Sequence, residues 1–124
     1  MIMIFSVITV TFNDASNLAR TKDSVTSQSF KDFEWIIVDG NSTDNTIYLL
    51  DKINSERIKI ISEDDSGLYD AMNKGILASK GKYIVFLNSG DIFDNRDLLS
   101  NVFDSIKGDP QLIYGDSKEV SNNN

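Results

Sequence analysis

Runs of apolar residues of strand length alternate along the chain with segments whose apolar positions recur at helical spacing. Strands are predicted over residues 3–11, 34–39, 57–62 and 82–87, and a fifth begins at 112–114. Helices are predicted between them, one over about 15–28 and the others marked by apolar residues within 47–53, 68–76 and 98–106. Such alternation is typical of a three-layer α/β/α domain with a mainly parallel sheet.

Capping residues predict where these helices begin and end. We expect Asn13 or Asp14 to cap the first helix, and Thr43 or Asp44 to cap the second. Gly81 is expected to end the third helix, and a Gly-Asp-Pro sequence is expected to end the fourth. The strand that begins at Lys82 is apolar enough to be central in the sheet.

Ligands of parallel sheets bind beyond the carboxyl ends of the strands. The candidate site is therefore built from the loops 11–14, 39–44, 63–70 and 88–91, and the carboxylates that directly follow the second, third and fourth strands are Asp39, those of 63–65, and Asp91. Carboxylates gathered at one edge repel each other unless a cation joins them, and Mg²⁺ or Mn²⁺ bound to phosphate oxygens meets that need. Each Asp is also explained by a turn or a cap alone, so both readings stay open.

Composition narrows the chemistry further. The chain has 124 residues, a net charge of −7, and neither His nor Cys. A Cys or His zinc site, a disulfide scaffold and any thiol- or His-dependent nucleophile are excluded. The acidic balance argues against nucleic acid as a partner. No apolar stretch reaches the length of a membrane span, and no signal peptide is recognised, so a cytoplasmic location is expected.

Glycine-rich phosphate loops are missing, since neither GxGxxG after the first strand nor GxxxxGK[ST] occurs. Five other motifs occur in register with the predicted strands: SVITVTFN (6–13), WIIVDGNSTDNT (35–46), SEDDSGLYDAMNKGI (62–76), GKYIVFLNSGD (81–91) and LIYGD (112–116). Together they resemble the nucleotide-sugar-binding half of a family 2 glycosyltransferase with the GT-A fold, which is nucleotide-diphospho-sugar transferase-like. The segments SGLYDAMNKG and FLNSGD further resemble those of bacterial enzymes of surface-polysaccharide biosynthesis.

The resemblance implies an inverting transferase that moves a sugar from a nucleoside-diphosphate sugar, with a UDP-sugar favoured, to an acceptor hydroxyl. It assigns binding of that donor substrate to Thr11, Phe12, Asn13, Asp39, Asp65, Tyr69, Asp70, Asn73, Lys74, Asn88, Ser89 and Gly90. Thr11 and Phe12 would lie against the base, and Asp39 would accept a hydrogen bond from a base imide N–H such as that of uracil. For Phe12, a place in the hydrophobic core is the alternative.

The ribose and diphosphate would face Asp65 and the helix from Tyr69 to Gly75. Asp70 and Asn73 are three positions apart, so they share one face of that helix. Lys74 would pair with a phosphate, although a solvated lysine is the commoner outcome.

The metal motif of this fold is usually written Asp-x-Asp. Here the position reads Asn88-Ser89-Gly90-Asp91, so an amide stands where the first carboxylate is expected. Asp91 is the implied ligand of Mn²⁺ or Mg²⁺, and phosphate oxygens and water would complete the shell. One carboxylate holds a divalent ion less tightly than two, so the departure bears on the strength of metal binding.

The resemblance covers a donor-binding domain over residues 1–118, with 119–124 as a frayed tail. The C-terminal acceptor part and the general base are expected beyond residue 124. A glycan or lipid-linked acceptor is implied, and a homo-oligomer and peripheral association with the inner face of the membrane are allowed. Because the donor half of full enzymes packs against the acceptor half, self-association or marginal stability is expected of this chain.

Two other classes of protein fit parts of the pattern. A receiver-type signalling domain also has a parallel sheet and an acidic Mg²⁺ pocket, but it needs an acidic pair after the first strand, where Thr11, Phe12 and Asn13 stand. A non-catalytic nucleotide-sugar-binding fragment would share every donor-site residue, so the sequence does not separate it from an enzyme.

Overall fold

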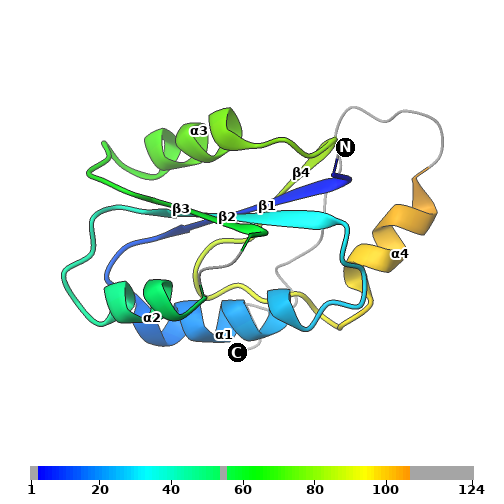
Figure 1. The fold of residues 1–124 in the computed structure, drawn as a ribbon, viewed down its shortest axis with the longest axis horizontal. Coiled ribbons are helices and arrows are strands. Elements are labelled where there is room, and N and C mark those ends of the chain that lie inside the picture. The colour runs from blue at the N-terminus through cyan, green and yellow to red at the C-terminus, as the bar shows by residue number, and fades with distance from the viewer. Residues whose placement is uncertain (1–2, 54–55, 107–124) are drawn as a thin grey trace.

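The computed structural model describes residues 3–53 and 56–106, in which four parallel strands form one sheet (Figure 1). The strands are β1 (Phe5–Thr11), β2 (Phe33–Asp39), β3 (Ile58–Ser62) and β4 (Tyr83–Phe86), in the spatial order β3-β2-β1-β4. The helices are α1 (Ala15–Thr26), α2 (Thr46–Ile53), α3 (Leu68–Ala78) and α4 (Leu98–Ser105). The predicted strand at 112–114, the Gly-Asp-Pro sequence and the boundary at residue 118 lie outside the described residues.

The predicted three-layer architecture is confirmed. Helix α3 covers one face of the sheet, and α1 and α2 cover the other (Figure 1). Alternate residues of β2 point to the two faces: Trp35 and Ile37 belong to the core beneath α1 and α2, and Ile36 and Val38 to the core beneath α3. Burial on both faces explains why β1 and β2 are almost continuously apolar and β-branched.

The register of the strands brings their carboxyl ends together. Thr11 at the end of β1 pairs with Asp39 at the end of β2, and Asp39 pairs with Ser62 at the end of β3. Strand β4 pairs with β1 alone among the described strands, so its predicted central place in the sheet is not tested by them. The edge where these strands end is the edge at which the candidate site was predicted.

The capping prediction is confirmed for α2; for α1 the position is confirmed, at Asp14, but the capping hydrogen bond is not made. Asp44 accepts a hydrogen bond from the Thr46 N–H at 2.9 Å. Bonds from the hydroxyl and N–H of Thr46 hold the pKa of Asp44 below its ordinary value. Asp14 occupies the cap position of α1 but makes no capping hydrogen bond. The side chain of Asn13 instead accepts the N–H groups of Thr43 and Asp44, so it joins two loops.

Gly81 does not end α3, contrary to the prediction. The helix ends at Ala78, and Ser79 already has extended backbone. Gly81 stands where β4 approaches β1: a Cβ there would lie 2.5 Å from the backbone carbon of Phe5 and from the backbone nitrogen of Ser6. The glycine is therefore required by the close contact of two backbones.

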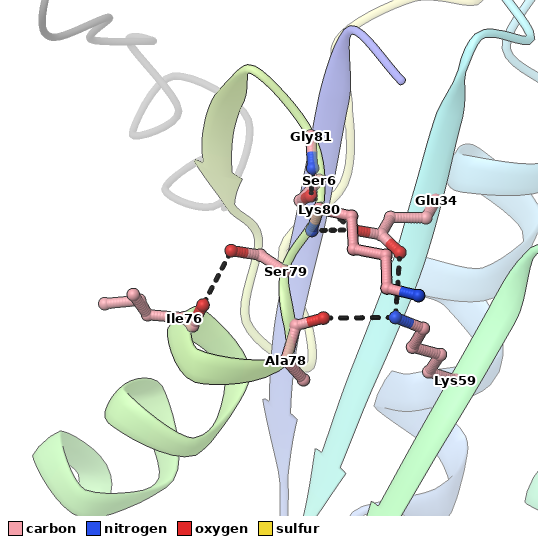
Figure 2. A network of polar contacts seen from close by, with 8 residues as sticks. All are labelled: Ser6, Glu34, Lys59, Ile76, Ala78, Ser79, Lys80 and Gly81. Atoms are coloured by element: carbon pink, nitrogen blue, oxygen red, sulfur yellow. Dashed lines mark hydrogen bonds and ion pairs between the residues drawn. The ribbon is translucent and has the colours of Figure 1, made fainter. Parts of the chain in front are cut away.

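A buried polar network ties the connection between α3 and β4 to the sheet (Figure 2). The carboxylate of Glu34 on β2 accepts the Ser6 hydroxyl at 2.6 Å and the Lys80 N–H, and it pairs with Lys59 Nζ at 3.4 Å. The Ser6 hydroxyl in turn accepts the Gly81 N–H at 2.7 Å. Every oxygen of this buried carboxylate has a partner, so the network positions α3 and is not a free binding site.

No helix in the described part of the chain combines the length and the apolar character needed to cross a membrane.

Candidate functional site

A cleft of about 340 Å³ opens at the carboxyl edge of the sheet. Its walls come from the end of β1, the connection between β3 and α3, and the residues after β4. The lining residues are Val10, Thr11, Phe12, Asp14, Asp65, Gly67, Leu68 and Ser89. Four of the predicted donor-binding residues thus share one cleft, at the place where parallel sheets bind ligands.

Two buried polar atoms beside this cleft lack a partner among the described residues: Thr11 Oγ1 and Asn88 Oδ1. Thr11 is only 3% exposed, and a buried hydroxyl or amide without a hydrogen bond is costly. Thr11 ends β1 and Asn88 lies two residues after β4, and the segments run side by side there, since the Ser89 N–H donates to the Val10 carbonyl at 3.1 Å. Both atoms are available to hydrogen-bond a bound molecule.

Phe12 lies at the mouth of the cleft and is 58% exposed, so the alternative that places it in the core is wrong. Its ring is close to Gly40 and Asp65: a Cβ on Gly40 would lie 3.3 Å from Phe12 Cδ1 and 3.0 Å from Asp65 Oδ2. An aromatic ring with an exposed face beside a carboxylate is suited to a planar, polar ligand.

Asp39, at the end of β2, is completely buried and is not among the residues that line the cleft. Its Oδ2 accepts the Ser42 N–H at 3.0 Å and the Ser62 hydroxyl at 2.8 Å, and its Oδ1 accepts the Ser42 hydroxyl. Three of the roughly four acceptor positions of a carboxylate are therefore used inside the protein. The predicted bond to a base N–H would have to use the remaining position.

The loop before α3 is held by its own carboxylates. Asp65 Oδ1 accepts the Gly67 N–H at 3.0 Å, and Asp70 Oδ2 accepts the Ser66 N–H at 2.8 Å. These bonds place the start of α3 against the cleft, and Gly67, with a φ of 116°, adopts a backbone conformation that other residues rarely reach.

Lys74 is engaged by the same acidic loop. Its Nζ donates to the Asp64 carbonyl at 2.6 Å and lies 3.6 Å from Glu63 and 3.7 Å from Asp70. It is therefore neither fully solvated nor at the cleft wall. Tyr69, which is 78% exposed, and Asn73 face solvent and do not line the cleft.

Asp91 ends a tight turn that begins at Asn88, whose carbonyl accepts the Asp91 N–H at 2.8 Å. Gly90, the third residue of this turn, has a φ of 98°. Within the described residues, no three Asp, Glu, His or Cys side chains gather closely enough to form a complete metal site. The unpaired Asn88 oxygen and the single Asp91 carboxylate nevertheless fit a Mn²⁺ or Mg²⁺ ion that takes its other ligands from a bound diphosphate and water.

Asp14 is a cleft residue that the sequence reading assigned to a helix cap. Its carboxylate accepts the Ser89 hydroxyl at 3.1 Å and the Asn17 side-chain N–H at 2.9 Å, so it joins the end of β1 to the turn of Asp91. Its position directly after the first strand, in a loop already placed at the ligand edge, was the signal for this role.

A parallel α/β domain with a cleft at its carboxyl edge belongs to the class of α/β proteins that bind ligands beyond the ends of their strands. Comparison with known sequences then identifies the family. The profile described as Glycosyl transferase family 2 matches residues 6–124, and the chain belongs to this family. The resemblance drawn from the five motifs is confirmed, and the receiver-type alternative is wrong.

Curated relatives are glycosyltransferases of bacterial glycan biosynthesis. A PGL/p-HBAD biosynthesis glycosyltransferase of Mycobacterium bovis is 38% identical over 117 residues, which cover 90% of this chain and 46% of that protein. The Escherichia coli UDP-Glc:alpha-D-GlcNAc-diphosphoundecaprenol beta-1,3-glucosyltransferase WfgD is 26% identical over 119 residues, or 95% of this chain and 47% of that protein. The chain thus spans about half the length of these relatives.

Solved structures confirm the fold as that of GT-A glycosyltransferases. Residues 1–349 of S. aureus TarS in complex with UDP-GlcNAc match with a TM-score of 0.76 and 27% identity, over 82% of this chain and 30% of that one. A mannosyltransferase of Pyrobaculum calidifontis, in complex with GDP-Man and Mn²⁺, has a TM-score of 0.73 and 22% identity, over 83% of this chain and 32% of that one.

Proposed function

We propose that this chain forms the donor-binding part of a glycosyltransferase that takes a UDP-sugar and transfers the sugar, with inversion, to an acceptor hydroxyl of a growing bacterial glycan. The carrying observation is the cleft at the carboxyl edge, which is lined by Thr11 with its unpaired hydroxyl, by the exposed Phe12 and by Ser89, the neighbour of the unpaired Asn88. The names of two relatives support uridine as the base, since one is a UDP-Glc transferase and another was solved with UDP-GlcNAc.

In this proposal the base stacks on Phe12, whose ring has an exposed face, and the Thr11 hydroxyl gains the hydrogen bond that it lacks in the protein. Asp39 accepts the base N–H through its remaining acceptor position. The three bonds from Ser42 and Ser62 hold that carboxylate in a fixed orientation, which makes the acceptor selective.

The diphosphate would lie toward the turn from Asn88 to Asp91. Asp91 and the Asn88 oxygen would hold Mn²⁺ or Mg²⁺, while Gly90 lets the ligand approach the backbone closely. A bound divalent ion would neutralise the departing diphosphate as the bond to the sugar breaks. Lys74, Asp70 and Asp65 would act mainly by shaping the loop before α3, because their charges already pair within it.

Tyr69 and Asn73 would meet the sugar or the acceptor from the solvent-exposed side of α3. The general base and most of the acceptor site are proposed to lie beyond residue 124, in the length of the relatives that this chain does not span. Transfer would then require both parts, whereas nucleotide binding would require the cleft described above.

Calorimetry tests the proposal directly. UDP is expected to bind in the presence of Mn²⁺, more tightly than GDP, and Asp91→Asn is expected to weaken that binding about tenfold or more because the ion loses its charged ligand. Asp94→Asn, which changes an exposed carboxylate three residues further on, is the matched control and should leave the affinity unchanged. Failure of UDP and GDP to bind, with Mn²⁺ and without it, would overturn the proposal.

A further inference from the structure

The inner face of α1 and the residues just after it carry a row of polar side chains among the apolar ones. Thr21 and Ser24 lie on α1, and Gln28 lies two residues after its end, so the three follow each other at spacings of three and four beside the buried Leu18 and Val25. Thr21 and Gln28 are as completely buried as the apolar residues beside them. Polar groups are costly in such a position unless they are hydrogen-bonded, so their partners define what the row does.

The partners are backbone atoms of the segment that follows β4. Ser24 Oγ accepts the Phe93 N–H at 3.2 Å, and Gln28 Nε2 donates to the Asn95 carbonyl at 2.8 Å. The row therefore holds an irregular segment against α1 and replaces the hydrogen bonds that a strand or a helix would supply.

Thr21 binds the part of this segment that carries the proposed metal ligand. Its Oγ1 accepts the Gly90 N–H at 2.9 Å and donates to the Asp91 carbonyl at 2.7 Å. A hydroxyl is one donor and an acceptor at once, so one side chain restrains both residues. Gly90 needs this restraint, because a glycine with a φ of 98° has several other conformations open to it.

We propose that Thr21 is a positioning residue of the donor site, which orients the Asp91 carboxylate toward Mn²⁺ and the diphosphate by fixing the backbone on both sides of the Gly90–Asp91 peptide. The inference rests on the proposed function and names a residue that does not itself touch the donor. Asp14, at the start of α1, accepts a hydrogen bond from Ser89 of the same turn, so the turn is held at two points. Without the hydroxyl, the carboxylate samples orientations that cannot ligate the ion.

Thr21→Val removes the hydroxyl and keeps the shape of the side chain. We expect the UDP affinity measured calorimetrically with Mn²⁺ to fall about 10- to 100-fold, which is the usual effect of losing a partner that orients a metal ligand. The UDP affinity in EDTA should stay within about twofold of wild type, because no metal contact is made there. Thr21→Ser, which keeps the hydroxyl, should restore the Mn²⁺-dependent affinity.

Gln28→Met is the matched control, since it removes buried backbone hydrogen bonds of the same row at a distance from Asp91. It should lower the melting temperature and leave both UDP affinities unchanged. Amide hydrogen exchange gives a readout independent of the metal: the Gly90 N–H should exchange faster in Thr21→Val than in wild type. If Thr21→Val does not fold, Thr21→Ala takes its place with the same expectations.

Equal loss of UDP affinity with Mn²⁺ and in EDTA, or the same loss in Gln28→Met, would overturn the positioning role and leave Thr21 a structural residue. Wild-type affinity in Thr21→Val would overturn it as well. In each of these results the wild-type protein still binds UDP, so the proposed function stands. Failure of the wild type itself to bind UDP would instead overturn the proposed function.

Discussion

Glu34 shows how a single buried carboxylate is stabilised in this protein. Burial raises its pKa, but hydrogen bonds from the Ser6 hydroxyl and the Lys80 N–H, together with the charge of Lys59, outweigh burial and hold the pKa below its ordinary value. The charged form is therefore favoured in the folded state more than in the unfolded chain. Folding stability that depends on this group must accordingly depend on pH.

Glu34→Gln is expected to lower the free energy of unfolding at pH 7 by about 1–3 kcal/mol, because it weakens charged hydrogen bonds in a buried place. As the pH falls below the ordinary carboxyl range, the unfolded chain takes up a proton before folded Glu34 does, so wild-type stability declines. The difference between wild type and Glu34→Gln should therefore shrink between about pH 5 and pH 3. Urea unfolding at several pH values measures this.

Asp23→Asn is the control for that experiment, since Asp23 pairs with Lys22 at the exposed surface. It should change the free energy of unfolding by less than about 0.5 kcal/mol at any of these pH values. A pH-independent difference between Glu34→Gln and wild type would contradict the role of the charge.

Residue roles were predictable where their partners are close in the sequence. Asp44 caps a helix two residues away, and the preference of Asp for that place sufficed to predict it. Asn13 binds N–H groups about 30 residues later, and Thr21 binds backbone about 70 residues later. No local preference encodes such partners, so these two roles required the structure.

At the scale of elements, two glycines determine how closely α3 and its connection to β4 approach β1. A Cβ on Gly75 of α3 would lie 2.5 Å from the Ile8 side chain, whereas a Cβ on Gly81 would meet the backbone of Phe5 and Ser6 at the same distance. A side chain can adjust its rotamer, but two paired strands cannot separate without losing their hydrogen bonds. The two sites thus differ in the nature of the obstacle.

Gly75→Ala is expected to destabilise the protein by about 1–3 kcal/mol, as overpacking of a core does. Gly81→Ala should cost more than Gly75→Ala, because its obstacle is backbone. Thermal unfolding shows which of the two variants loses more stability. Leu77→Ala, on the exposed face of α3, is the control and should have a small effect. Equal stability of the two glycine variants would contradict the close contact of β4 with β1.

Alternation of apolar runs and helical spacing predicted all eight described elements in the right order, because both faces of the sheet are covered and each buried strand is nearly all apolar. Their ends were less predictable. The prediction that Gly81 ends a helix follows from the frequency of glycine after helices, whereas the glycine is required by the close approach of two strands that lie far apart in the sequence. The cleft was placed correctly by the rule for parallel sheets, and Asp14 lay in one of the predicted loops, but its role in the cleft was not predicted.

At the scale of the whole molecule, charge opposes the proposed ligand. The chain carries a net charge of −7, and Asp14 and Asp65 line the cleft itself. A diphosphate is also an anion, so without a cation its approach is electrostatically unfavourable. A divalent ion beside Asp91 would offset most of the negative charge that Asp14, Asp65 and Asp91 place there.

Raising the ionic strength is therefore expected to tighten UDP binding in EDTA, because salt screens the repulsion. The effect should be much smaller with Mn²⁺. Uridine, which has the same base and ribose without the diphosphate, is the matched control, and its affinity should not depend on salt. Calorimetry at low and high salt measures the affinities for UDP in EDTA, for UDP with Mn²⁺ and for uridine. Weaker UDP binding in EDTA at high salt would contradict the prediction.

The order of the strands in space differs from the order in which a ribosome makes them. β1 is synthesised first but lies between β2 and β4, and its Thr9 hydroxyl meets a carbonyl 78 residues later. At the usual rate of translation, roughly 4–16 s pass between the two. During that time one side of β1 has no neighbour, and the cleft lacks the wall that follows β4. A nascent chain therefore acquires the proposed nucleotide site late, in the step that closes the sheet.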